Sequence, residues 1–253
     1  MKTKMWVVVF IALTCLLSGC SKQKRIPFKE LMLKNEMYYY SAELFNGIAF
    51  TLYDDGTLES ELTVTDGEIK GPYKLWYENG NLAIKGNIFE WRGFARLRMP
   101  SVEDKVDNVT EFHYWNGKLQ AWYENKQLAF DGNIFIDEFM GVQKMWYKNG
   151  QLFFEGSFVN GIEDGVHKAW HENGQLAAVT SFVNGEEDGV LKAWHENGQL
   201  AVETSYVNGE KDGVHKEWYE NGQLAVEMSY VKGREKSWKE WDENGIMTDQ
   251  WPR

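Results

Sequence analysis

The stretch GVLKAWHENGQLAVETSYVNGEKDG, residues 189–213, decides the fold because the chain repeats it. Its aromatic residue Trp194 has counterparts at steps of 24 residues in both directions, apart from one interval of 46 residues and a last step of 23. Counting a weaker core in LYDDGTL, the cores are centred on Leu52, Trp76, Trp122, Trp146, Trp170, Trp194, Trp218 and Trp241. A short period of this kind is typical of stacked structural units.

Each core is predicted to form a β-hairpin, because Glu-Asn-Gly lies between two runs of alternating apolar residues. A two-residue Asn-Gly turn would scatter the apolar residues over both faces of the sheet. A three-residue loop with Gly174 in the left-handed conformation instead places Trp170 opposite Leu176. In that register one face is expected to carry Val166, Trp170, Leu176, Ala178 and Phe182. Residues 184–189 are expected to form a wider polar turn to the next hairpin.

Consecutive hairpins can pair side by side into one sheet. Eight units contribute sixteen strands, and at ~4.8 Å per strand the sheet would be roughly 75 Å long. A hairpin of this size cannot bury its aromatic face alone, so its stability must come from its neighbours. The sequence therefore predicts an all-β fold over residues 37–253, an elongated single antiparallel twisted sheet of tandem hairpins. The ends, Met37–Glu43 and Trp241–Arg253, are expected to act as caps.

The regular pattern fails between Trp76 and Trp122, where one core is missing. Residues 90–112 fill this interval, and the pattern breaks at Pro100. We expect a degenerate repeat with a bulged loop. The alternative is an interaction loop, whose candidate residues are Arg92, Arg96 and Arg98 in a chain otherwise dominated by acidic residues.

The chain begins MKTKMWVVVFIALTCLLSGC, with two lysines before an apolar run that is short for a membrane span. Residues 1–19 are predicted to be a lipoprotein signal peptide, because Leu17-Ser18-Gly19-Cys20 resembles the bacterial lipobox. The resemblance implies cleavage before Cys20 and its acylation. Ser21 stands where an inner-membrane retention signal would have Asp, so the resemblance favours the outer membrane. Residues 20–36 are predicted to form a lipidated tether.

The net charge and the cysteine content exclude several classes of partner and chemistry. Removing residues 1–19 takes away two lysines and no acid, so the net charge changes from −11 to −13. This negative charge argues against binding to nucleic acid and against adhesion to anionic lipid surfaces. Loss of Cys15 and acylation of Cys20 would leave no free thiol, which excludes disulfides and cysteine chemistry.

The turn motifs resemble a known family. WYKNGQL at 146–152, WHENGQL at 170–176 and WYENGQL at 218–224 are each followed by Phe or Tyr and then by Val-Asn-Gly or Val-Lys-Gly. These units resemble MORN-type repeats, in the bacterial variant carried by proteins labelled YwqK-family antitoxins. The resemblance covers about residues 42–247, with a gap near 90–112. It implies a groove-bearing sheet of β-hairpins and a role in protein or membrane contact, not an active site.

A Lys-x-Trp pair recurs along the chain and is the candidate binding stripe. Residues two apart in a strand share a face, so each lysine could lie against its tryptophan in a cation–π contact. Such a basic and aromatic stripe would suit an extended acidic peptide or a glycan, whereas simple packing with a solvated ammonium is the alternative. The stripe comprises Lys74, Trp76, Lys144, Trp146, Lys168, Trp170, Lys192, Trp194, Lys216 and Trp218, with Lys239 and Trp241 as a further pair.

Other chemistry is not expected. His167 and His171 would be ~13 Å apart along a strand, too far to share a metal ion, and the acidic Gly loops lack the ligand count of a calcium loop. Nearly every polar residue has a counterpart one period away, unlike a unique catalytic constellation. We therefore expect no enzyme, no cofactor and no metal site.

Three functions remain open. The preferred hypothesis is a lipid-anchored envelope protein whose repeat sheet is a scaffold for binding another protein. The first alternative is an antitoxin or immunity protein that binds a toxin. The second is a structural protein that binds cell-wall glycan.

Overall fold

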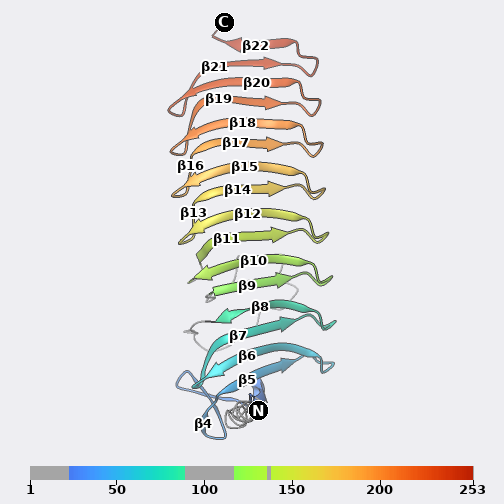
Figure 1. Ribbon diagram of the computed structural model, residues 1–253, viewed down its shortest axis with the longest axis vertical. Helices are drawn as coiled ribbons and strands as arrows, with labels where there is room; N and C mark the ends of the chain where they lie inside the picture. Colours follow the sequence, from blue (N-terminus) through green and yellow to red (C-terminus); the bar gives the residue numbers. More distant parts are fainter. Residues whose placement is uncertain (1–22, 89–116, 136–137, 253) are drawn as a thin grey trace, which may run out of the picture.

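The computed structural model describes residues 23–88, 117–135 and 138–252. Within these ranges, strands of one large sheet follow one another along the long axis of the molecule (Figure 1). The sheet is open and antiparallel apart from its first strand, as expected for tandem hairpins. The described residues form eight hairpins, one for each core, made by β5 (Gly47–Leu52) and β6 (Leu58–Thr65), β7 (Glu68–Trp76) and β8 (Leu82–Ile88), β9 (Gly117–Trp122) and β10 (Leu128–Phe135), β11 (Glu138–Trp146) and β12 (Leu152–Val159), β14 (Gly165–Trp170) and β15 (Leu176–Val183), β17 (Gly189–Trp194) and β18 (Leu200–Val207), β19 (Glu210–Trp218) and β20 (Leu224–Val231), and β21 (Arg234–Trp241) and β22 (Met247–Trp251).

The fold begins earlier than the predicted boundary at residue 37. β1 (Arg25–Pro27) pairs in parallel with β5 at the end of the sheet, and the one-turn helix η1 (Phe28–Glu30) follows it. A second, three-stranded sheet contains β2 (Met32–Lys34), β3 (Met37–Tyr40) and β4 (Glu43–Leu44). Residues 25–34, assigned above to the tether, thus belong to the folded part, because Ile26 is buried in the core.

The sheet is continuous where the repeat pattern fails. β8 pairs directly with β9, with Ile84 opposite Ala121, although 28 residues separate the two strands in the sequence. The predicted degenerate repeat near 90–112, with Arg92, Arg96 and Arg98, lies outside the described residues, and so does Cys20.

The turn between β14 and β15 confirms the register predicted at Trp170. Trp170 lies opposite Leu176, and Gly174 has a φ of 85° in the three-residue loop between them. The connection to the next hairpin differs from the prediction, because Val183 pairs with Glu186 and leaves a tight two-residue turn. Asn184 and Gly185 have φ values of 52° and 85°, as a type I′ turn requires. The short strands β13 (Ile162–Glu163) and β16 (Glu186–Glu187) follow two of these turns.

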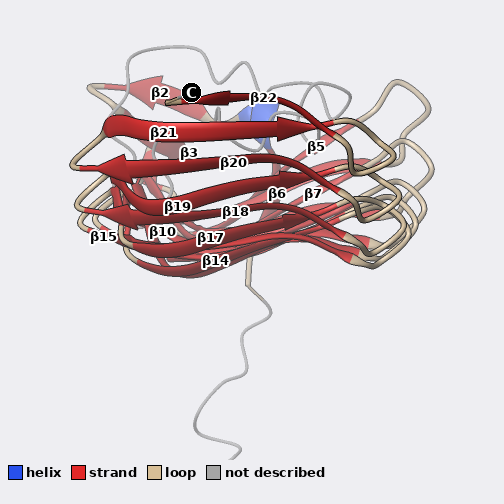
Figure 2. Ribbon diagram, turned by 90° about the horizontal axis from the view of Figure 1, so that it is seen from above, coloured by secondary structure: helices blue, strands red, loops and turns tan. Residues whose placement is uncertain are grey.

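The hydrophobic core is confined to the first half of the sheet. Every buried hydrophobic side chain of the described residues lies between Ile26 and Ile134, and Phe28, Tyr38 and Tyr40 pack against this core. Among the described residues beyond Ile134, the buried side chains are polar: Gln143, His167, Thr204 and His215. Viewed along its long axis, the sheet is bowed, and both ends rise toward the side on which β2 and η1 lie (Figure 2).

Candidate functional site

The second half of the sheet has two different faces. In β14, the residues Val166, Lys168 and Trp170 alternate with His167 and Ala169. We call the face that carries Val166, Lys168 and Trp170 the Lys–Glu face, and the face that carries His167 and Ala169 the aromatic face. The same names apply to the equivalent positions of the other hairpins. Phe182 lies opposite Gly165 and Ala178 lies opposite Ala169, so both belong to the aromatic face, not to the face of Trp170 as predicted.

A β-bulge is the physical reason for this correction. Trp170 pairs with Leu176, but Ala169 pairs with Ala178, which leaves Ala177 as an extra residue. The extra residue moves the remainder of β15 by one position, so Phe182 changes face. Val166 consequently shares its face with Ser181 and is 53% exposed.

Lysines and glutamates alternate in one row across the Lys–Glu face. Each lysine lies opposite a glutamate of a neighbouring strand, from Lys144 and Glu155 to Lys239 and Glu227. The ion pairs measured between Nζ and a carboxylate oxygen are Lys144–Glu155 at 2.6 Å, Lys192–Glu203 at 2.8 Å, Lys216–Glu227 at 3.3 Å and Lys239–Glu227 at 3.9 Å. Val179 interrupts the row between Lys168 and Lys192.

In this row the lysines of the predicted stripe lie beside carboxylates, so the row is not purely basic. None of the cation–π contacts among the described residues joins a lysine of the stripe to its tryptophan. The lysines are compensated by carboxylates from adjacent strands, which the spacing within one strand does not reveal. Near the other end, Lys74 lies between Glu61 and Lys85. The structure therefore brings the predicted lysines into one row with carboxylates, whereas the tryptophans each lie opposite a leucine.

The aromatic face has a different composition. Phe158, Phe182, Tyr206 and Tyr230 occupy equivalent positions, each opposite a glycine of its own hairpin. His167 lies among three of the phenylalanines, with ring centroids 5.5 Å from Phe154, 5.1 Å from Phe158 and 4.8 Å from Phe182. Packing of these rings stabilises a face that no second layer of described residues covers.

Acidic groups act on the two tyrosines of this face. Burial raises the pKa of the Tyr206 phenol, and the charge of Glu187 together with its hydrogen bond raises it further. Burial also raises the pKa of Tyr230, with a contribution from the charges of Glu235 and Glu217. Both phenols therefore stay neutral hydrogen-bond donors at physiological pH.

Four histidines of the repeats, including His167 and His171, have structural partners. His167 Nε2 contacts the carbonyl of Ser157 at 2.9 Å, and His215 lies between Thr204 Oγ1 at 2.6 Å and Glu217 Oε1 at 2.9 Å. His171 and His195 each reach a tryptophan carbonyl of the next hairpin at 2.8 Å. Among the residues that the structure describes, no three histidine, cysteine or acidic side chains form a group that could hold a metal ion.

The Asn residue of each turn motif joins neighbouring hairpins, a role the sequence did not reveal. Asn197 Oδ1 accepts a hydrogen bond from the N–H of Gln199 in its own loop at 2.9 Å. Its Nδ2 donates to the carbonyl of Glu220 in the next loop at 2.7 Å. The same two bonds recur at Asn125, Asn149, Asn173 and Asn221. The identical period of these motifs was the signal that could have indicated a contact between repeats.

The tyrosine or histidine after each tryptophan of the repeats makes a second series of hydrogen bonds between neighbouring hairpins. Tyr147 Oη donates to the carbonyl of Trp170 at 2.9 Å, and Tyr219 Oη donates to that of Trp241 at 2.9 Å. In the last hairpin, Asp242 occupies this position and instead accepts hydrogen bonds from the backbone N–H groups of Asn244 and Ile246. Tyr and His are interchangeable here because both present a donor at the end of a flat ring.

Replacing Asn197 by alanine is expected to lower the free energy of unfolding by about 1–2 kcal/mol, because two hydrogen bonds and one contact between hairpins are lost. Chemical denaturation would measure this change. Asn244→Ala is the matched control, since Asp242 already closes that loop. Equal losses in the two variants would contradict a stabilising role for the ladder between hairpins.

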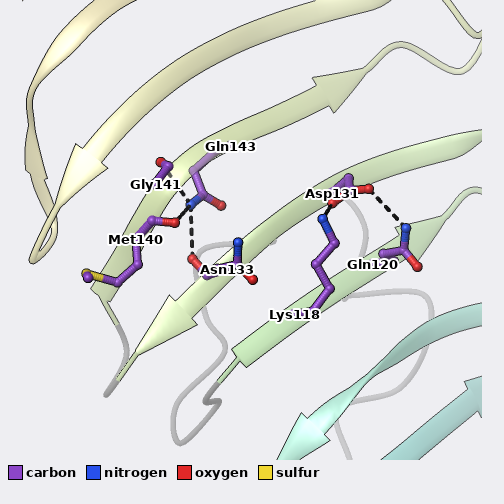
Figure 3. A network of polar contacts seen from close by, with 7 residues as sticks. All are labelled: Lys118, Gln120, Asp131, Asn133, Met140, Gly141 and Gln143. Atoms are coloured by element: carbon purple, nitrogen blue, oxygen red, sulfur yellow. Dashed lines mark hydrogen bonds and ion pairs between the residues drawn. The ribbon is translucent and has the colours of Figure 1, made fainter.

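Gln143 is the most buried polar side chain of the middle of the sheet (Figure 3). Its Nε2 donates to the carbonyls of Met140 at 2.8 Å and Asn133 at 3.0 Å, while its Oε1 has no hydrogen-bond partner. Nearby, Asp131 accepts from Gln120 at 3.0 Å and forms an ion pair with Lys118. Gln143 thus fills the space above Gly132 and ties the irregular start of β11 to β10.

None of the described helices is long and apolar enough to cross a membrane.

A family model described as a MORN repeat variant matches five segments of the chain: residues 69–88, 141–160, 163–184, 187–208 and 211–232. Each segment corresponds to one hairpin, from its first strand to the end of its second. A comparison with curated proteins finds no match. The remaining hairpins, such as β9–β10, have the same loop and the same pairing as the matched ones. The repeated hairpins and the five matched segments support a MORN-type repeat protein.

Proposed function

We propose that this protein is a lipid-anchored component of a bacterial envelope whose repeat sheet serves as a scaffold for binding another protein. The observation that carries the proposal is one long sheet that presents regular rows of side chains on two faces. MORN repeats are often protein-interaction or membrane-binding modules, which supports a scaffold role.

The proposed anchor rests on the first twenty residues. A basic start, a short apolar run and the sequence Leu-Ser-Gly-Cys together fit a lipoprotein signal with Cys20 as the acylated residue. Attachment through lipid also suits an acidic protein, since anionic membrane surfaces would repel it.

The proposed activity is binding without catalysis. Many polar residues of the second half recur once per repeat, and the turn asparagine and the ring after the tryptophan bond to a neighbouring hairpin. A row of equivalent groups can contact an elongated partner at several points, whereas a reaction needs a single site with distinct roles for its residues.

Crosslinking followed by affinity capture of the full-length protein from envelope extract tests the scaffold function. We expect one stoichiometric protein partner to be recovered, and a toxin-like partner would favour the antitoxin or immunity alternative. Recovery of cell-wall glycan without any protein would overturn the scaffold proposal and support the glycan-binding alternative.

Replacing Cys20 by alanine is expected to move nearly all of the protein out of the mature, membrane-attached form, because the acylated sulfur is lost. Membrane fractionation and metabolic labelling with a fatty acid measure the effect. Cys15→Ala is the matched control, since that residue would leave with the signal peptide. Unchanged acylation in the Cys20 variant would refute the anchor.

A further inference from the structure

The aromatic face from β13 to β22 carries an excess of acidic side chains. Glutamates from several strands lie on it, and Lys211 is the lysine found among them, opposite Tyr206. None of these glutamates forms an ion pair with a lysine or arginine among the described residues. The five glutamates are Glu163, Glu187, Glu217, Glu235 and Glu240.

The opposite face of the same strands is electrically compensated. Its lysines alternate with glutamates, and Glu227 lies within 4 Å of both Lys216 and Lys239. The two faces of one sheet therefore present different electrostatic surfaces. A partner attracted by charge is directed to the aromatic face.

Apolar groups lie between the glutamates. Val226 is flanked by Glu217 and Glu240 on the adjacent strands, and Tyr230 lies opposite Glu235. Half-buried Trp238 and 48% exposed Trp251 pair with each other at the last strands. A ligand for this surface must therefore supply both positive charge and apolar side chains.

We propose that the aromatic face of β13–β22 binds a basic amphipathic segment of a partner protein. This inference rests on the proposed scaffold function and specifies the chemistry of its partner. The face is opposite to the one that the Lys-x-Trp spacing suggested, and its partner has the opposite charge.

Charge also disfavours other occupants. Nucleic acids and anionic lipid surfaces would be repelled by the glutamates. A second copy of the chain offers no basic face in exchange, because the Lys–Glu face is compensated and the chain carries a net charge of −11. A cationic polypeptide is the occupant that fits both the charge and the aromatic surface.

Fluorescence anisotropy on the lipidated full-length protein in phosphatidylcholine nanodiscs tests this inference. The probe is a labelled Lys/Leu amphipathic peptide, and empty nanodiscs give the background. We expect saturable binding that weakens as salt is raised, and no comparable binding of a Glu/Leu peptide of the same length. Absence of binding by the Lys/Leu peptide, or equal binding of both peptides, would overturn the proposal.

Paired substitutions locate the site. Glu217→Gln with Glu240→Gln should weaken binding of the Lys/Leu peptide about five- to tenfold, since two exposed charge contacts are lost. Glu203→Gln with Glu227→Gln removes the same charge from the Lys–Glu face and should leave binding nearly unchanged. Equal weakening by both pairs would show attraction to net charge alone and would overturn the assignment to the aromatic face.

The two proposals can fail separately. If envelope crosslinking captures one protein partner and the Glu217/Glu240 variant captures it equally well, the scaffold function stands and this inference fails. If both paired variants have the same midpoint temperature of unfolding as the wild type, loss of folding is excluded as the cause of weaker binding.

Discussion

Replacing Phe130 by alanine is expected to lower the free energy of unfolding by about 3–5 kcal/mol, the range typical of a large aromatic side chain removed from a core. Phe130 is fully buried, and it lies opposite Ala121 on one side and Met145 on the other. Its ring also stacks on Phe139 at a centroid distance of 6.0 Å. Urea denaturation followed by tryptophan fluorescence measures the loss.

The same strand supplies a matched control. Phe135 is 54% exposed at the end of β10, so Phe135→Ala should change the free energy of unfolding by less than about 0.5 kcal/mol. A small effect at Phe130 would contradict a core confined to the first half of the sheet. A second transition at low urea in the Phe130 variant would show that the two halves unfold separately.

Replacing Gly132 by alanine should destabilise the protein by about 3 kcal/mol, at the upper end of the range for overpacking. The added Cβ would overlap Oε1 of Gln143 and lie 2.6 Å from Cζ of Phe130. Gln143 cannot move away easily, because its Nε2 is held by the carbonyls of Met140 and Asn133. The thermal midpoint and the urea midpoint should both fall.

A double-mutant cycle separates this clash from other effects. In a Gln143→Ala background, Gly132→Ala should cost clearly less, since the overlapping oxygen is gone. Thr180 occupies the equivalent position two hairpins later, so Thr180→Ala should have a small effect. Identical costs of Gly132→Ala with and without Gln143 would rule out the contact as its cause.

The turn chemistry shows how far local sequence can go. Glu-Asn-Gly between alternating apolar runs predicted a hairpin, and the demand for one coherent face predicted that Trp170 lies opposite Leu176. The same reasoning failed beyond the loop, because it did not include the bulge at Ala177 that moves Phe182 to the other face. Bulges depend on how two strands twist against each other, which the order of residues in one strand does not show.

The candidate site was harder to predict for a related reason. The spacing of Lys216 and Trp218 indicates a shared face, but the carboxylates that compensate the lysine belong to Glu203 and Glu227 on the two adjacent strands. Such partners are eleven or more positions apart in the sequence, and only the register joins them. The spacing therefore did not reveal the carboxylates beside the lysines, and binding by this stripe stays a prediction.

By itself, the sequence determined the repeat, the number of hairpins and the all-β sheet, because a period of about 24 residues with one turn motif admits little else. The tertiary structure decided which residues share a face and which carboxylates compensate the lysines. It also decided the role of the asparagine that recurs in the turn motif, such as Asn197. These properties arise between strands and between hairpins. They depend on register, bulges and stacking, which exist only once the chain has folded.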